Sequence, residues 1–564
     1  MRRYAPAPTI SDVFSEAETR KDPFPKALAR AEARLRDDDT AEARRDLGHL
    51  YYIDDRFEDA QRQLELAFRM FRDSGQPRDA ARAAIQLAGL HGSIFGHGAA
   101  ASGWVERARM LLDRVGPCVE WGYLELAQLA CERTDVDDLL ASAERALSIA
   151  LDFGDVDLEA QAIADGGLAL VTQGRTTQGF ARLDAALAAI STGEVSPLIA
   201  GVCFCSMLTA CDRTGDVRRA QEWTGIVMAM IRDFGDRPRV LHTHCRVAYG
   251  SVLRTAGRWP EAEASMLEAL GPANAPTRPH RELTIAHLAG LRLEQGRVEE
   301  AAELLVPFED RVTSCAPLAQ VHLMRGAPDL AVAVLQRGLR ELVADALRIG
   351  PLLSLLVVAE LQRGDLTAGG KAADRLEEMA DEADVASLVT DGHVARARVL
   401  AGSGDDGGAI ARFEQAIATL GDDERPLLLA TVRRELAEVL ARSGDRAGAI
   451  AEARAALACF ERLGADAFRD QVAALLRSLG DTSRARPQRA DEVAAALSVR
   501  EHEVLELVSL GLSNAEIASR LFISPKTAEH HVGRILTKLG VRSRGEAAAL
   551  AVLLAAASRG SDQQ

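Results

Sequence analysis

The side chains with the clearest capacity for chemistry form a polar face on one predicted helix, residues 525–539, near the C-terminus. At 100° per residue, that face and its flanks carry Lys526, Thr527, Glu529, His530, Gly533, Arg534, Thr537 and Lys538. Lysine and arginine can pair with phosphate, and side chains near the amino end of such a helix can reach base edges in a major groove. Gly533 has no side chain and permits close backbone approach. The pattern predicts a nucleic-acid recognition helix in preference to a surface helix of a structural bundle.

The elements that position this helix are indicated by their end signals. The opposite face is apolar and is expected to pack on two preceding helices; it consists of Ala528, Val532, Ile535, Leu536 and Leu539. Helix ends are marked by the pairs Ser498 and Glu501, Ser513 and Glu516, and Ser543 and Glu546, by Ser524 before Pro525, and by Gly511 and Gly540. These signals predict four helices, with the second and third joined as in a helix-turn-helix.

The segments REHEVL, GLSNAEIA, ISPKTAEHHV and KLGVRSR resemble the LuxR-type family of bacterial DNA-binding domains. The resemblance implies that the third helix enters the major groove and that the fourth supports dimerisation. It also implies phosphate contacts near Ser513, Asn514, Thr527 and Lys538, and base-facing positions at Glu529, His530 and Gly533. The predicted DNA-binding set is completed by Lys526, Arg534, Arg542 and Arg544.

Two positions depart from the family pattern, which often has lysine where Glu529 and Ala515 stand. Glu529 repels phosphate but can accept a hydrogen bond from cytosine. We therefore expect modest affinity and a target sequence that differs from that of lysine-bearing relatives.

A repeating turn signal fills most of the remaining sequence. Turn residues recur at Asp55, Gly96, Thr134, Gly174, Gly215, Gly257, Gly296, Gly326, Gly364, Gly404 and Gly444, with spacings of 38–42 residues and one of 30. Five positions after these turns stand Ala60, Ala101, Leu139, Gly179, Ala220, Ala262, Ala301, Ala331, Gly369, Ala409 and Ala449. A left-handed residue that ends one helix, followed by a small residue that lets the next helix pack closely, predicts a helical hairpin. The array resembles tetratricopeptide repeats with a longer period and divergent units.

The expected fold class is all-α: a tetratricopeptide-like helical-hairpin solenoid followed by a four-helix LuxR-type helix-turn-helix domain. We expect a disordered segment at 1–23, about eleven hairpins over 24–480, a linker at 481–492, the helix-turn-helix domain at 493–558 and a disordered tail at 559–564. Stacked hairpins form a curved solenoid whose concave face can hold a peptide, a protein or a small molecule. A spacer without a ligand is the alternative for this region.

The formal net charge of -16 is unevenly distributed. From Arg484 onward, 11 Lys and Arg face 9 Asp and Glu, a balance of +2, so the preceding residues carry -18. This distribution confines contact with DNA to the C-terminal region, although acidic surface elsewhere also serves solubility. Because no long apolar segment and no signal-peptide core are present, we expect no membrane partner and a cytoplasmic location.

The cysteines and histidines offer a weak signal for metal. Cys203 and Cys205 are poorly spaced for zinc on a helix, and the loose cluster of His242, His244 and Cys245 is better explained by helix packing. The eight cysteines contain no CxxC pair. We expect free thiols, which suit a reducing compartment.

No arrangement typical of an enzyme stands out, so we expect no catalytic activity and no cofactor. The stretch nearest to a phosphate-binding loop runs from Gly364 to Ala372, but it lacks the closing Ser or Thr and coincides with a repeat turn.

The predicted function is that of a sequence-specific DNA-binding transcription regulator. The expected partners are double-stranded DNA bound by a homodimer, RNA polymerase, and a peptide, protein or small molecule in the solenoid groove. The alternative is a protein-interaction scaffold with a vestigial helix-turn-helix, which Glu529 keeps open.

Overall fold

A computed structural model of the chain forms two compact units, Met1–Leu479 and Gly480–Gln564. It describes residues 24–129, 136–231, 243–270, 279–342, 345–420, 425–481, 499–510, 512–521, 524, 526, 528, 531–532, 535 and 551. The predicted segments 1–23 and 559–564 and most of the predicted linker lie outside these residues. The domain boundaries drawn from the sequence therefore stay predictions.

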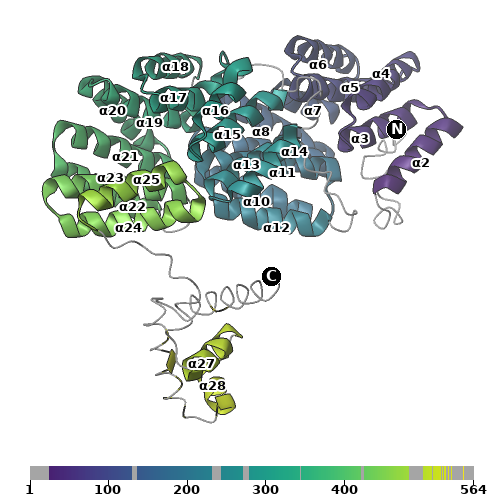
Figure 1. Cartoon of the computed structure of the whole chain (residues 1–564). Coiled ribbons are helices and arrows are strands. Elements are labelled where there is room, and N and C mark those ends of the chain that lie inside the picture. Colours follow the sequence, from purple (N-terminus) through teal and green to yellow (C-terminus); the bar gives the residue numbers. More distant parts are fainter. Residues whose placement is uncertain are drawn as a thin grey trace. The chain divides into compact units, whose positions relative to one another are not determined.

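The first unit is built from eleven pairs of helices, which follow α2 (Phe24–Asp37) and precede α25 (Asp466–Ser478) within the described residues (Figure 1). The pairs are α3 (Ala41–Ile53) with α4 (Phe57–Asp73), α5 (Pro77–Gly89) and its π-helical extension η2 (Leu90–Ile94) with α6 (Gly98–Leu112), α7 (Glu120–Leu129) with α8 (Val136–Phe153), α9 (Val156–Thr172) with α10 (Thr176–Ser191), α11 (Pro197–Thr214) with α12 (Val217–Ile231), α13 (Thr243–Thr255) with α14 (Trp259–Leu270), α15 (Pro279–Glu294) with α16 (Val298–Leu305), α17 (Cys315–Met324) with α18 (Pro328–Glu341), α19 (Ala346–Gln362) with α20 (Leu366–Glu382), α21 (Ala386–Ser403) with α22 (Asp406–Leu420), and α23 (Pro426–Ser443) with α24 (Arg446–Leu463). Two 3-10 turns, η4 (Val306–Phe308) and η5 (Val312–Ser314), precede α17. This architecture is the predicted all-α, tetratricopeptide-like solenoid.

The predicted turn residues lie where the first helix of a pair ends. Asp55 and all nine predicted turn glycines have φ between 60° and 95°, the left-handed region that glycine adopts without steric cost. Gly364, for example, follows α19, and the Asp365 carboxylate then accepts a hydrogen bond from the Ala368 N–H at 2.9 Å to begin α20. The hairpin prediction is confirmed at these ten turns; Thr134 lies outside the described residues. The Gly364 stretch is a repeat turn, as its position indicated.

The small residue five positions after each turn lies where the paired helices meet. The alanines at these positions are fully buried: Ala60, Ala101, Ala220, Ala262, Ala301, Ala331, Ala409 and Ala449. At Gly179, an added Cβ would lie 2.6 Å from the carbonyl oxygen of Gly167 on the preceding helix. A larger side chain would force the paired helices apart. Leu139, the exception in the pattern, is only half-buried.

Loop residues of the second half of the solenoid pack against turns in its middle. The Asp384 N–H donates to the carbonyl of Gly174 at 2.9 Å. The hydroxyls of Thr176 and Thr177 donate to the Asp384 carbonyl and carboxylate, across 208 and 207 residues of sequence. The solenoid therefore coils back on itself, so that repeats far apart in the sequence become neighbours.

Similar contacts between distant turns and loops occur further along the chain, and we call this set of contacts the seam. It joins Gly174, Thr176, Thr177, Gly257 and Gly296 to Ala383, Asp384, Pro426, Leu463 and Ala467. A Cβ added to Gly257 would lie 2.5 Å from Leu463 Cδ2 and 3.0 Å from Pro426 Cγ. The turn glycines of the seam are thus needed twice, for a positive φ and for close approach to a distant loop.

The apolar core crosses the seam as well. One cluster of buried side chains joins Phe204 of α11 and Val252 of α13 to Leu353 of α19 and Leu376 of α20. A second cluster joins residues of α13–α15 to residues of α23–α25, among them Phe460. Repeats on the two sides of the seam therefore share hydrophobic cores, and burial of these apolar side chains supplies most of the free energy that stabilises the seam.

The expectation that all cysteines are free thiols is wrong for one pair. Cys205 of α11 and Cys245 of α13 form a disulfide, with Cα atoms 5.0 Å apart and a sequence separation of 40. That separation is one repeat period, and stacking of successive first helices brings the two positions together. A pair one repeat period apart leaves no local spacing signal in the sequence. The described free cysteines, including Cys203, are buried.

Candidate nucleic-acid interface

The Gly480–Gln564 unit contains a small apolar core formed by three helical segments. α27 (Val499–Ser509) and α28 (Asn514–Leu521) are followed by the described residues of the predicted recognition helix. The core consists of Val504, Leu505, Leu507, Val508, Ile517, Ala518, Ala528, Val532 and Ile535. Burial of Ala528, Val532 and Ile535 confirms that the predicted apolar face packs on the two preceding helices. Leu536 and Leu539 lie outside the described residues.

A reciprocal capping box fixes the start of α28, as the sequence predicts. The Ser513 N–H donates to Glu516 Oε2 at 2.7 Å, and the Glu516 N–H donates to Ser513 Oγ at 3.4 Å. The Ser513 hydroxyl also donates to Glu516 Oε2 at 2.7 Å. These bonds, the one from the hydroxyl foremost, lower the pKa of Glu516 below its usual value. The carboxylate thus stays ionised and satisfies backbone groups that a helix start leaves open.

The recognition helix begins where Ser524 was expected to cap it. The Ala528 N–H donates to the Ser524 carbonyl at 3.0 Å, which is the first turn of a helix. Lys526 is exposed whereas Ala528 is fully buried. Two residues are separated by about 200° around a helix, so the exposed lysine lies opposite the core. Among the described residues, the predicted apolar face is thus buried and Lys526 of the predicted polar face is exposed.

Three of the predicted DNA-binding residues lie among the described residues. Ser513 is exposed but its hydroxyl is engaged with Glu516, Asn514 is half-buried, and Lys526 is exposed. The others lie outside the described residues: Thr527, Glu529, His530, Gly533, Arg534, Lys538, Arg542 and Arg544. Their assignments remain predictions from the sequence.

Residues 495–551 match the family described as "Bacterial regulatory proteins, luxR family". This segment is a LuxR-family DNA-binding domain. The helices α27 and α28 and the capping box agree with the first part of a helix-turn-helix arrangement, and relatives of this segment are transcription regulators.

Two relatives each match a short stretch of this chain. The transcriptional regulatory protein TdiR of Thauera aromatica is 45% identical over 73 residues, which cover 13% of this chain and 32% of TdiR. The oxygen regulatory protein NreC of Staphylococcus aureus is 52% identical over 50 residues, which cover 9% of this chain and 23% of NreC. This chain therefore spans a third or less of the length of these two relatives.

Two solved structures resemble the helical array at low sequence identity. The Cut9–Hcn1 hetero-tetramer structure gives a TM-score of 0.42 at 14% identity, covering 82% of this chain and 95% of that one. Yeast Tom70 gives a TM-score of 0.31 at 12% identity, covering 86% and 97%.

Two features of the LuxR-family domain were missed in the sequence. Leu510, which directly follows α27, is 69% exposed, and no local pattern distinguishes it from the buried leucines of that helix. His531 follows His530 on the recognition helix, and its buried Nδ1 has no hydrogen-bond partner among the described residues. The wheel places residue 531 beside the apolar face, which is the signal that separates it from His530.

The described residues hold no group of three or more His, Cys, Asp and Glu side chains suited to a metal ion. In the loose cluster of His242, His244 and Cys245, the Cys245 sulfur is engaged in the disulfide, and His242 lies outside the described residues. None of the described helices is both long and apolar enough to cross a membrane.

Proposed function

We propose that this chain is a one-component transcription regulator that binds a two-fold DNA site as a homodimer. The observation that carries the proposal is the orientation of the recognition helix, with Ala528, Val532 and Ile535 buried and Lys526 exposed. A polar helix held outward in this way can enter a major groove. Two domains joined in a dimer gain affinity through effective concentration, because one small module makes few base contacts.

In this proposal the residues divide into two roles. Ser513, Asn514, Lys526, Thr527, Arg534, Lys538, Arg542 and Arg544 contact phosphates and set the register, while Glu529, His530 and Gly533 face the bases. The acidic solenoid repels DNA and leaves contact to the LuxR-family domain. The solenoid senses a partner in the cytoplasm, and RNA polymerase is a further partner of the DNA-bound form.

A gel-shift series with the full chain, at increasing salt and on genomic fragments, tests the DNA-binding half. We expect sequence preference, and a salt slope that falls by about one when Arg534 or Lys538 is replaced by alanine. The control is Arg477→Ala, which removes an exposed arginine of α25 and should leave the slope unchanged. Glu529→Gln should alter preference at one base pair by about 1–3 kcal/mol.

The rival assignment, a scaffold with a vestigial helix-turn-helix, predicts a different result. Binding without sequence preference, and with a slope that Arg534→Ala does not change, would favour the scaffold. Absence of binding at low salt by protein shown to be dimeric would rule out the regulator.

A further inference from the structure

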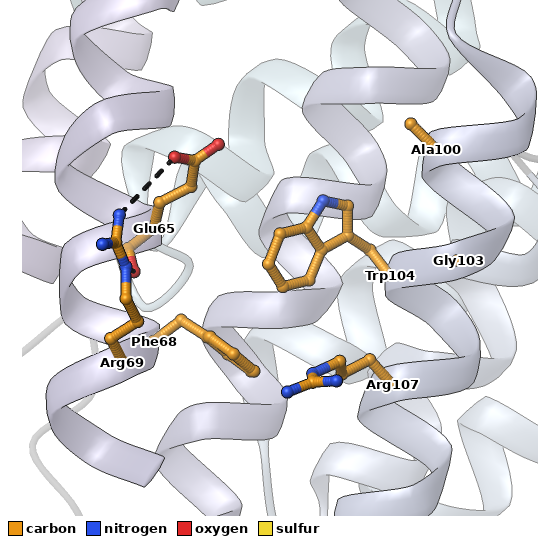
Figure 2. A pocket seen from close by; sticks show the side chains of 7 residues that line it. All are labelled: Glu65, Phe68, Arg69, Ala100, Gly103, Trp104 and Arg107. Carbon is orange, nitrogen blue, oxygen red and sulfur yellow. Dashed lines mark hydrogen bonds and ion pairs between the residues drawn. The ribbon is translucent and has the colours of Figure 1, made fainter. Parts of the chain in front are cut away.

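A groove lies on the first unit between α4 and α6, the second helices of the first two hairpins (Figure 2). Its volume is about 450 Å³. It is lined by Glu65, Phe68, Arg69, Ala100, Gly103, Trp104 and Arg107. Figure 2 shows the Trp104 and Phe68 rings between the two helices, with the charged side chains beside them.

The floor of the groove is aromatic and preformed. Phe68 is buried and Trp104 is half-buried, with ring centroids 5.1 Å apart and an interplanar angle of 82°. This edge-to-face contact holds both rings in place. The π-helical turn η2 contacts both α4 and α6, the two helices that carry these rings. Turns of this kind occur often at functional sites, because they interrupt a regular helix at some cost.

Gly103 leaves open space in the groove. Gly103 is an exposed residue of α6, and an added Cβ would meet no atom within 4 Å. Glycine inside a helix is unfavourable relative to alanine by about 1 kcal/mol. The helix accepts this cost at the position where a side chain would fill the groove.

The rims of the groove carry more positive than negative charge. Arg69 is 57% exposed and pairs with Glu65 only at 4.0 Å. Arg107 is exposed, its guanidinium carbon lies 5.5 Å from the Phe68 ring centroid, and no carboxylate among the described residues forms an ion pair with it. Two guanidinium groups therefore face one carboxylate, in a part of the chain whose net charge is -18. The local excess of positive charge favours an acidic partner.

Apolar surface continues beyond the groove. Met110 lies three residues, or about one helical turn, past Arg107 and is 59% exposed. A small molecule is usually enclosed by its site, whereas an open strip of apolar side chains with charged edges is typical of a surface that binds protein.

We propose that the α4–α6 groove binds an acidic segment of a partner protein, with an aromatic or large aliphatic side chain against Phe68 and Trp104 and carboxylates near Arg69 and Arg107. The inference deepens the solenoid half of the proposed function and rests on it. The segment lies along the groove as an amphipathic helix would, with apolar side chains inward.

Fluorescence anisotropy with the full chain tests the groove in the absence of DNA. The probe is a labelled acidic peptide with one phenylalanine and two leucines at helical spacing among glutamates, and its partner peptide has glutamine in place of every glutamate. Gly103→Leu fills the groove and Arg107→Glu reverses its rim charge. The matched controls are Gly225→Leu in α12, where an added Cβ also meets no atom within 4 Å, and Arg477→Glu in α25.

We expect Gly103→Leu, Arg107→Glu and the glutamine peptide each to weaken binding by at least about tenfold, with both controls within about twofold of the wild type. Circular dichroism should show unchanged helix content in every variant. Equal binding by Gly103→Leu and Gly225→Leu, or no binding of the acidic peptide, would overturn the proposal.

Two other results would also overturn it by naming another occupant. Binding that appears only after removal of residues 1–23 would assign the groove to the chain's own N-terminal segment. Self-association that Gly103→Leu abolishes, without peptide binding, would assign it to a second copy. A failure of DNA binding alone would leave the peptide result unchanged, so the two proposals fail separately.

Discussion

Replacing Gly257 with alanine tests whether the seam stabilises the solenoid. The residue has φ of 76°, and a Cβ there would lie 2.5 Å from Leu463 Cδ2 and 3.0 Å from Pro426 Cγ. A left-handed alanine costs about 1–2 kcal/mol, and forcing an extra carbon into a packed contact costs about 1–3 kcal/mol more. The expected loss in free energy of unfolding is therefore about 2–5 kcal/mol.

Gly364→Ala is the matched control for this variant. Gly364 occupies the equivalent turn of another hairpin with φ of 81°, but an added Cβ there meets no atom within 4 Å. It should lose only the backbone contribution of about 1–2 kcal/mol. The difference between the two variants isolates the contact across the seam.

Hydrogen exchange read by mass spectrometry is the preferred assay, because a long repeat array need not unfold in a single step. Gly257→Ala should reduce protection in α13 and α14 and also in α24 and α25, which lie on the other side of the seam. Gly364→Ala should leave α24 and α25 unchanged. Equal effects of both variants, or loss of protection confined to α13 and α14, would refute the reasoning.

Three other changes test separate parts of the chain. Reducing the Cys205–Cys245 disulfide removes a cross-link spanning 40 residues and should lower the free energy of unfolding by about 4 kcal/mol, measured by calorimetry with and without dithiothreitol. Burial, with a smaller effect of Arg45, lowers the pKa of His49 to about 3. As the pH falls, His49 therefore takes up a proton in the unfolded state, near pH 6.5, before it does so in the folded state. Between pH 6.5 and pH 3 the free energy of unfolding should decrease by up to about 1.4 kcal/mol per pH unit. Urea unfolding of the wild type and of His49→Gln measures this decrease. Ser513→Ala should lower the stability of the LuxR-family domain by about 1 kcal/mol, because it removes the cap of α28, and thermal unfolding measures this loss.

Each of these changes has a control. Cys205→Ser should be insensitive to dithiothreitol, and a wild type that is equally insensitive would contradict the cross-link. Parallel pH profiles for the wild type and His49→Gln would show that His49 does not contribute. Ser509→Ala removes a hydroxyl whose bond is to the Glu506 carbonyl of its own helix, so a loss equal to that of Ser513→Ala would contradict the capping role.

The sequence by itself determined the local elements of this protein. A left-handed turn and a small residue five positions later are properties of a few neighbouring residues, so the hairpins could be predicted from them and ten of the eleven turns are confirmed. The inward face of the recognition helix followed in the same way from its 100° period, and Ala528, Val532 and Ile535 are buried as that period requires. Capping at Ser513 depends on a partner only three residues away.

Only the tertiary structure decided which distant repeats meet. Local pattern fixes each hairpin, but the small rotation between successive hairpins accumulates along the solenoid and sets where its coils touch. That rotation brings Asp384 to Gly174 and Leu463 to Gly257. Stacking of two successive first helices, α11 and α13, places Cys205 beside Cys245. The α4–α6 groove likewise depends on packing between two hairpins, which leaves Phe68 and Trp104 in contact and Gly103 open to solvent.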